Sequence, residues 1–248
     1  IDHHTPVERE GVKYYNPRIE DKDDIRPVTY WCYKVTKKDL WVAVVGCIAD
    51  WYMPDFIKDF LKDYPDLLDK EIKDPGDALF KTRIGELAKI FSFLLKGKTS
   101  DVNKNLAILT RIENPYEILD QNTPKGKFLF RYYEKINKRY QELLKEALET
   151  KSDKILLFTY PSFKYSFSND LANELMYKLK DKLIIVAREK NGEMKVSLRS
   201  NVHLLPPIVE KALKDVEGYG GGHEHACGGN IAKRDFNKFV DAIRKEIE

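Results

Sequence analysis

The spacing of apolar positions changes near residue 150. Before that point, apolar residues recur three and four positions apart, as they do on the buried face of a helix. Within 39–50, for example, Leu40, Val44 and Ile48 fall on one face. We predict helices at about 27–36, 39–50, 55–63, 77–96, 101–112 and 115–121.

The longest uninterrupted helical pattern runs from Pro124 to Thr150. A repeat of four residues places side chains along one side of a helix. We therefore predict one long helix here. It either connects two domains or is an ordinary amphipathic helix within one of them. The repeating positions are Phe128, Tyr132, Ile136, Tyr140, Leu144 and Leu148.

Beyond residue 151, short apolar runs alternate with helical patterns. The runs 155–158 and 183–186 predict buried strands, and 195–199 alternates as a half-buried strand does. Asn191-Gly192 is a strong signal for a hairpin turn. This order of strands and helices indicates an α/β domain. Helices are predicted at 169–180, after Pro206-Pro207 and from about Arg234, with a glycine loop between the last two.

The first residues of the chain show a third pattern. We predict the end of a buried strand and then a loop over residues 1–6. Val12–Tyr15 is predicted as a short strand before a turn at Asn16-Pro17.

Composition is that of a globular protein. The 248 residues suffice for one large domain or two ordinary ones, and 42% hydrophobic residues can form a core. The net charge of +3 does not by itself predict nucleic-acid binding. Cys32, Cys47 and Cys227 form no disulfide framework, so we expect reduced thiols and a cytoplasmic protein. We expect neither secretion nor a membrane partner, since we find no leader and no apolar run of about 18 residues.

Four of the five histidines lie in two short clusters at opposite ends of the chain. Imidazole is the commonest side-chain metal ligand. Consecutive glycines mark a positive φ or a close approach of backbone to a ligand. A capped turn is the ordinary alternative for either cluster. The clusters are Asp2-His3-His4 and Gly220-Gly221-Gly222-His223-Glu224-His225.

Together the clusters resemble motifs of the DHH phosphoesterase superfamily, in the branch with a C-terminal DHHA1 domain. Asn16-Pro17 follows the triplet at a similar interval, and residues 44–50 resemble the motif that ends in a metal-binding aspartate. Residues 196–200 resemble the DHHA1 strand whose arginine meets the substrate phosphate. The resemblance implies two α/β domains joined by a long helix, with the active site in the cleft between them. The ranges would be 1–123 for an N-terminally incomplete DHH domain, 124–150 for the connecting helix and 151–248 for the DHHA1 domain.

The resemblance also implies roles for individual residues. His3 and Asp50 would be metal ligands, Asp2 would orient the histidine, and His4 would hydrogen-bond the scissile phosphate. Two Mn²⁺ or Mg²⁺ ions are expected, since such pairs activate water and neutralise a phosphodiester. The family's other ligands lie upstream of the triplet, so this chain, starting at Ile1, is expected to carry only part of the site. The residues expected to bind substrate phosphate are Arg199, Gly220, Gly221, Gly222 and His223.

The implied activity is metal-dependent phosphodiester hydrolysis, as in RecJ-like archaeal-type exonucleases acting on single-stranded DNA or RNA. A replication or repair helicase is the implied protein partner. Two alternatives stay open: a nanoRNase or cyclic-dinucleotide phosphodiesterase, and a catalytically inactive replication scaffold. A bound polymer would need basic and stacking side chains. Lys164, Tyr165, Phe167 and Tyr160 are candidates, although aromatic residues at such positions more often belong to a core.

Overall fold

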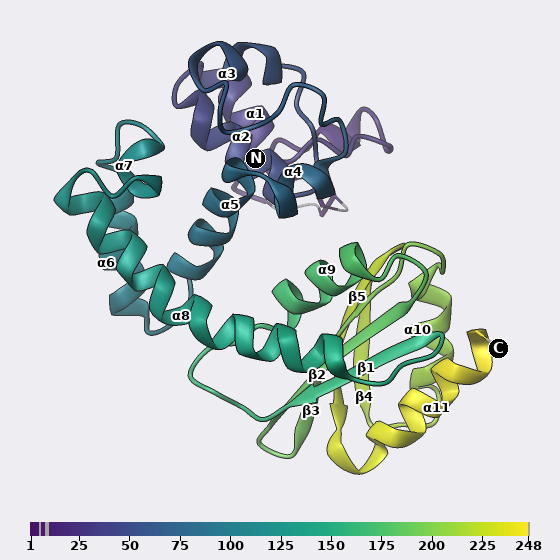
Figure 1. The fold of residues 1–248 in the computed structure, drawn as a ribbon. Helices are drawn as coiled ribbons and strands as arrows, with labels where there is room; N and C mark the ends of the chain where they lie inside the picture. Colours follow the sequence, from purple (N-terminus) through teal and green to yellow (C-terminus); the bar gives the residue numbers. More distant parts are fainter. Residues whose placement is uncertain (5, 8–9, 248) are drawn as a thin grey trace. The chain divides into compact units, whose positions relative to one another are not determined.

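The computed structural model describes residues 1–4, 6–7 and 10–247. They fall into two compact units, Ile1–Tyr133 and Glu134–Glu248. The boundary lies inside one long helix, α8 (Pro124–Glu149), which matches the predicted long helix. Within the described residues, no helix combines the length and the apolar character that crossing a membrane requires. Figure 1 colours the chain along its sequence, from purple in the first unit to yellow at the end of the second.

The first unit is built from helices. The predicted helical segments are confirmed, except that 77–96 contains two helices. Thr82 separates them, because its backbone is extended and its hydroxyl oxygen accepts a hydrogen bond from the Gly85 N–H at 3.3 Å. The elements are η1 (Pro17–Ile19), α1 (Val28–Thr36), α2 (Leu40–Ala49), α3 (Ile57–Asp63), α4 (Pro75–Lys81), α5 (Arg83–Leu94), α6 (Thr99–Leu109), α7 (Tyr116–Leu119) and the beginning of α8.

The strands predicted near the start of the chain are wrong. Among the described residues, neither 1–4 nor 12–15 forms a strand, and Thr5 lies outside them. One backbone hydrogen bond joins the two segments, from the Asp2 N–H to the Tyr15 carbonyl at 3.0 Å. A ladder needs a series of such bonds, so the first unit is helical rather than α/β.

Helix α2 is the buried centre of the first unit. Val44 and Ile48 are fully buried, in agreement with the apolar face predicted for them. Gly46 allows α1 to pack closely on α2, because a Cβ at this position would lie 2.5 Å from Cγ2 of Thr29 on α1. The packing of α1 on α2 therefore fixes where the end of α2, and with it Asp50, is placed.

The second unit is a mixed five-stranded sheet with helices on both faces, which confirms its predicted α/β character. The strand order is β1-β2-β3-β5-β4; β1 and β2 are parallel and all other pairs are antiparallel. After α8, the elements are β1 (Ile155–Tyr160), α9 (Ser168–Lys178), β2 (Leu183–Lys190), β3 (Glu193–Arg199), α10 (Leu205–Leu213), β4 (Gly218–His223), β5 (Ala226–Ala232), η2 (Lys233–Asp235) and α11 (Phe236–Ile247).

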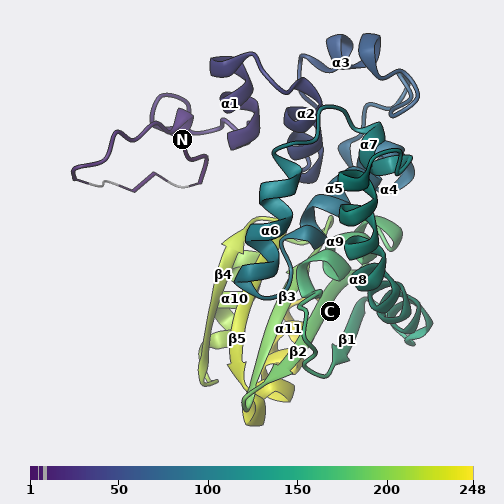
Figure 2. The same ribbon diagram turned by 90° about the vertical axis from the view of Figure 1, so that its left-hand side faces the viewer.

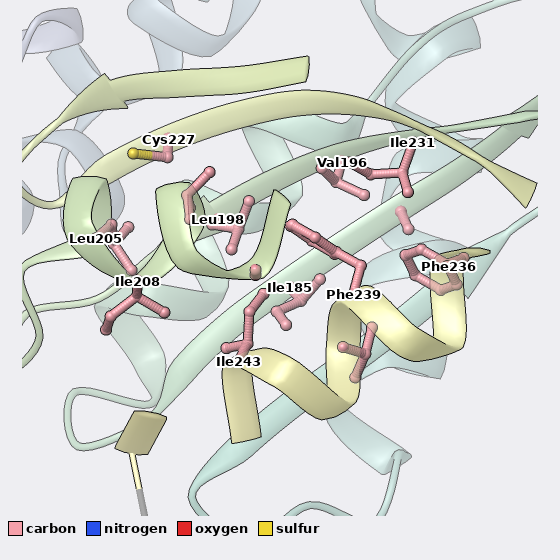
Figure 3. Close-up of a cluster of buried hydrophobic side chains, with 14 of the residues drawn as sticks. Ile185, Val196, Leu198, Leu205, Ile208, Cys227, Ile231, Phe236, Phe239 and Ile243 are labelled. Carbon is pink, nitrogen blue, oxygen red and sulfur yellow. The ribbon is translucent and has the colours of Figure 1, made fainter. Parts of the chain in front are cut away.

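One face of this sheet is covered by α10 and α11. Figure 3 shows Leu198 and Ile185 of the sheet near Phe239 of α11, with Leu205 and Ile208 of α10 further along the same cluster. The opposite face of β2 and β3 is covered by α9, and the Tyr140 hydroxyl of α8 donates to Glu174 on that helix at 2.7 Å. Burial of apolar side chains on both faces holds the layers together.

The glycine run predicted as a loop is a strand. Residues 218–223 form β4, which pairs with β5 and lies at one edge of the sheet, with β1 at the other (Figure 2). Glycine has little strand preference, but here it allows close contact. A Cβ on Gly222 would lie 2.3 Å from the carbonyl oxygen of Ala226. The pairing with β5 therefore requires glycine at this point.

The buried face of α8 follows mixed spacings of three and four residues instead of the predicted strict repeat. Steps of four residues rotate by about 40° around the helix axis each time, since a turn takes 3.6 residues. The strict repeat therefore leaves the buried face, and Leu148 is 42% exposed. The buried apolar residues are Leu129, Tyr133, Ile136, Tyr140, Leu143, Leu144 and Ala147.

Candidate metal and phosphate sites

The Asp2 carboxylate organises the first histidine cluster. Its Oδ1 accepts hydrogen bonds from the backbone N–H groups of His3 and His4, at 2.8 and 3.2 Å. The same oxygen lies 2.8 Å from Nδ1 of the His4 ring. The His4 imidazole beside it holds the pKa of Asp2 well below its usual range. An ionised Asp2 accepts a hydrogen bond from the Nδ1–H of His4, which favours that tautomer and fixes the orientation of the ring.

Further hydrogen bonds hold Asp2 in place. The Tyr14 hydroxyl donates to Oδ2 of Asp2 at 3.0 Å and accepts from the Asn16 side-chain NH₂ at 2.9 Å. The same amide nitrogen donates to the His4 carbonyl at 2.9 Å. Asn16 is buried, and its Oδ1 caps η1 by accepting from the Arg18 N–H. The hydrogen bonds of Asn16 therefore hold the segment around Tyr14 and η1 against Asp2-His3-His4.

His3 faces Asp50 from a different part of the first unit. Nε2 of His3 lies 3.5 Å from Oδ2 of Asp50, and the two side chains are 20% and 50% exposed. Asp50 is the C-cap of α2, where an acid opposes the helix dipole. The helix dipole does not account for a carboxylate at this position, which favours a binding role for Asp50.

The chain directly after Asp50 is strained. Trp51 has φ +56°, which is unusual for a bulky residue. Its N–H bonds to the Ile48 carbonyl at 3.0 Å, and the Tyr52 N–H bonds to the Cys47 carbonyl at 2.9 Å. These two bonds make a Schellman motif, in which glycine is the usual residue at the Trp51 position. The motif ends α2 sharply and holds Asp50 at the exposed corner.

The His3 and Asp50 donors fit one side of a metal site. Two ligands with bonds of about 2.0–2.2 Å to one ion are about 2.8–3.6 Å apart, and this pair is 3.5 Å apart. An imidazole nitrogen with a carboxylate oxygen suits Mn²⁺. In the part of the chain that the structure describes, no group of three or more His, Cys, Asp or Glu side chains is placed to hold a metal. These two donors by themselves would fill only part of a coordination shell.

Cys47, which lies three residues before Asp50, is not suited to bind a metal. The thiol is fully buried on α2. Burial raises the pKa of Cys47 to about 12. The thiol therefore stays protonated at neutral pH, whereas metal binding needs the thiolate.

In the second unit, Arg199 presents a guanidinium without a carboxylate partner among the described residues. Its Nε donates to Oδ1 of Asn173 at 2.6 Å, and its Nη1 donates to the carbonyl oxygens of Leu198 and Cys227. Burial lowers the pKa of Arg199 from its ordinary value. A half-buried cation held only by neutral groups favours an anionic ligand.

The sheet register places His223 on the same face as Arg199. Arg199 of β3 pairs with Ala226 of β5, and Ala226 pairs with His223 of β4. Paired residues of antiparallel strands point to the same face, so Ala226 separates the two by two strand spacings, about 10 Å. The small methyl group leaves room between an arginine and a histidine, which suits a phosphate group.

Gly220, Gly221 and Gly222 are brought to the same sheet edge in extended conformation. An anion-binding nest needs successive N–H groups that converge, and in a strand they alternate in direction. The N–H groups of these extended glycines therefore do not converge as those of a nest do. An edge strand does leave alternate backbone groups unpaired, so a phosphate contact through one of them stays a prediction.

Two of the proposed stacking aromatics lie in the core. Tyr160 and Phe167 are 3% and 0% exposed, and the Tyr160 hydroxyl accepts from the Phe167 N–H at 2.9 Å. These two cannot stack on a base. Tyr165 is half-buried and Lys164 is exposed, so only these two of the four are accessible.

Sequence reasoning misses the residues that hold the site together. The sequence pattern places Tyr14 in a strand, and the hydrogen bonds of Asn16 and Asn173 have no local signal. An Asn before a Pro is a turn signal, which points to Asn16 but not to its contact with His4. Asn173 lies on α9, far from Arg199 in sequence, and only the packing of α9 on β3 joins them.

Comparison with known proteins agrees with the motif resemblance. Residues 152–248 match the DHHA1 domain family. No curated protein sequence matches the chain. RecJ from Thermus thermophilus in complex with Mn²⁺ has a similar fold, with a TM-score of 0.65 and 16% identity over 99% of this chain and 40% of RecJ.

Two further solved structures are similar. The DHH domain of a member of a family of ribosomal proteins has a TM-score of 0.59 and 14% identity, over 100% of this chain and 62% of its own. The pGpG-specific phosphodiesterase from Vibrio cholerae has a TM-score of 0.52 and 14% identity, over 75% of this chain and 67% of its own. This chain thus spans less than half the length of the Thermus RecJ structure. It carries a DHHA1 domain at residues 152–248, in a fold similar to those of RecJ exonuclease and other DHH domain proteins.

Proposed function

We propose that this chain belongs to a metal-dependent phosphodiesterase that acts as an exonuclease on single-stranded DNA or RNA. The observation that carries the proposal is the pair His3 and Asp50, 3.5 Å apart, beside a His4 ring oriented by Asp2. The DHHA1 domain and the fold similarity to RecJ support the same conclusion. An Asp-oriented histidine next to a pair of metal-binding donors is suited to phosphoryl chemistry.

In the first unit, some residues would bind metal and one would contact the phosphate. His3 and Asp50 would hold Mn²⁺ or Mg²⁺, one of two ions expected, which when bound supplies activated water and charge neutralisation. The Nδ1–H of His4 would stay hydrogen-bonded to Asp2, and uptake of a proton at Nε2 would give a donor for a phosphate oxygen. Asp2 would orient the His4 ring, and Tyr14 would hold the Asp2 carboxylate in position.

The second unit would hold the substrate. Arg199 binds a phosphate oxygen pair, because its guanidinium has no anionic partner of its own among the described residues. His223 adds a second contact to the same group from β4. Substrate binding and metal binding are therefore separable by mutation.

Digestion of end-labelled single-stranded DNA and RNA with Mn²⁺ tests the proposal. The assay uses this chain and any natural polypeptide that extends it upstream. Wild type should release products stepwise, and His3→Ala and Asp50→Asn should abolish release. Asp39→Asn, an exposed aspartate at the other end of α2, is the matched control. Equal activity in wild type and both site variants would refute the metal assignment.

A second candidate is hydrolysis of dinucleotides, which the fold similarity to the pGpG-specific phosphodiesterase favours. Turnover of pGpG and pApA with none of a long oligonucleotide would select it. Retained binding without turnover of any substrate would select the inactive scaffold. We also propose a replication or repair helicase as protein partner, which co-purification with the native protein would test.

A further inference from the structure

The sheet face opposite α10 and α11, which α9 covers in part over β2 and β3, carries a second polar row beyond the phosphate site. The register joins Arg188 of β2 to Lys195 of β3, Lys195 to Asn230 of β5, and Asn230 to Tyr219 of β4. Paired residues share a face, so these four side chains form one row, called the distal row here. It lies on the same face as Arg199 and His223, because Lys195 comes four residues before Arg199 on β3 and Tyr219 four residues before His223 on β4.

Polar groups of the distal row lack partners among the described residues. Nε of Arg188 and Oδ1 of Asn230 are buried from solvent and make no hydrogen bond. Lys195 is exposed and forms no ion pair with any described residue. Buried polar atoms are normally paired, and an unpaired one calls for a ligand or an ordered water. The row therefore has an unpaired donor on Arg188 and an unpaired acceptor on Asn230, with the Lys195 cation between them. This combination suits a polar anionic ligand.

Tyr219 provides an aromatic surface at the outer end of the row. Its side chain is 71% exposed, and no ring contact involves it within the described part of the chain. The neighbouring backbone is accessible too. A Cβ on Gly221 would meet no atom within 4 Å, and one on Gly228 would meet only the Val196 carbonyl, at 3.4 Å. A base could therefore lie against Tyr219 with its sugar and phosphate over a floor of glycine.

We infer that the distal row is a second nucleotide subsite, at which Tyr219 stacks on a base while Lys195 and Arg188 contact a phosphate of the same polynucleotide. This inference rests on the proposed function and specifies its substrate as a single-stranded polynucleotide. Arg199 and Lys195 are four residues apart on β3, which separates their Cα atoms by about 13 Å. Arg199 is held in place by Asn173 and two carbonyls, so the two cations serve different phosphates.

The combination of contacts favours nucleic acid over an acidic peptide. Unspecific single-strand sites combine a basic track with aromatic stacking platforms. Here the cations Arg199, Arg188 and Lys195 follow one face, with an exposed ring beside them. A dinucleotide held at Arg199 and His223 does not need the distal row. Oligonucleotide length therefore reports on whether the row is used.

The test is fluorescence polarisation of labelled single-stranded oligonucleotides of increasing length, from a dinucleotide to an octanucleotide, in EDTA to prevent cleavage. Wild type should bind longer oligonucleotides more tightly than the dinucleotide. Tyr219→Ala should weaken binding of the longer ones about 5-fold to 150-fold, the effect of losing one stacked base. Tyr219→Phe keeps the ring and should bind as wild type does. Circular dichroism confirms that each variant is folded.

The charge contact has its own measurement. Lys195→Gln should reduce the slope of log affinity against log salt by about 0.7, the value for one phosphate of a single strand. Lys190→Gln, on the same sheet but outside the row, should leave the slope unchanged. Arg199→Gln should weaken the dinucleotide and the longer oligonucleotides alike.

The outcomes distinguish failure of the distal row from failure of the proposed function. If Arg199→Gln weakens binding while Tyr219→Ala and Lys195→Gln have no effect, the distal row is not a subsite and the proposed function stands. If wild type binds no oligonucleotide of any length, the inference and the proposed substrate class are both wrong. An equal loss of dinucleotide binding in Tyr219→Ala would also overturn the inference, because the row would then serve the first nucleotide.

Discussion

The Tyr14 hydroxyl donates to the one carboxylate oxygen of Asp2 that the histidines do not use. It reaches Oδ2 at 3.0 Å, while Oδ1 accepts from the backbone of His3 and His4 and faces the His4 ring. Both oxygens of Asp2 are therefore engaged, and the carboxylate cannot rotate without losing hydrogen bonds on both sides. The orientation of His4 thus depends on a tyrosine ten residues further along the chain.

Removing the Tyr14 hydroxyl should loosen His4. In Tyr14→Phe, Oδ2 of Asp2 loses a donor and Asn16 loses an acceptor. We expect a mixture of His4 tautomers in place of the Nδ1–H form, visible in the ¹⁵N chemical shifts of the ring. Tyr15→Phe is the control, because the Tyr15 ring contacts Trp31 and the substitution keeps the backbone carbonyl that accepts from the Asp2 N–H. Unchanged ring shifts in Tyr14→Phe would show that Asp2 orients His4 without help.

Replacing Asp50 should weaken Mn²⁺ binding. Asp50→Asn removes the anionic donor opposite His3, and we expect at least about a tenfold loss of affinity, the lower end of what losing even an outer partner of a metal site costs. Electron paramagnetic resonance of free Mn²⁺ measures it. Asp39→Asn should bind as wild type does. Equal affinity in Asp50→Asn and wild type would remove Asp50 from the metal site.

Gly46→Ala should destabilise the first unit. In an unobstructed helix this change would stabilise by up to about 1 kcal/mol, but here the new Cβ would lie 2.5 Å from Cγ2 of Thr29. Overpacking of this kind costs about 1–3 kcal/mol. Urea denaturation measures the loss, and Thr29→Ala in the same chain should recover part of it. A more stable Gly46→Ala protein would mean that α1 moves away from α2 at little cost.

The Asp24–Arg26 pair should make stability depend on pH. Asp24 is buried, and the Arg26 guanidinium hydrogen-bonded to it holds the pKa of that carboxyl below its usual value. A depressed folded-state pKa gives stability that is present above the unfolded value and is lost as pH falls through the folded value. Asp24→Asn should therefore cost about 1–3 kcal/mol at pH 7.

The difference between wild type and Asp24→Asn should shrink as the pH falls below the unfolded-state value. Thermal denaturation at a series of pH values measures this convergence. Asp23→Asn, which changes an exposed neighbour, should follow wild type throughout. Parallel curves for wild type and Asp24→Asn would mean that Asp24 is not ionised against Arg26 in the folded protein.

Local patterns in the sequence were enough for elements that bury an apolar face by themselves. The repeat at Leu40, Val44 and Ile48 predicted α2, and hence a helix end at Asp50, because helix periodicity is a property of neighbouring residues. The Asn191-Gly192 turn was predicted for the same reason, since both residues adopt the positive φ that the hairpin needs. The candidate ligands were recognised from short motifs, and their roles stay predictions.

Only the tertiary structure decided which residues meet. The glycines of 218–223 form a strand because β5 pairs with them, and Val12–Tyr15 forms none because no ladder reaches it. The row from Arg188 to Tyr219 joins four strands through their register, and His3 meets Asp50 through the packing of the first unit. The sequence by itself determined the local elements and the types of chemical group. Hydrogen-bond pairing and close packing between distant segments determined the sites, because those interactions exist only once the chain has folded.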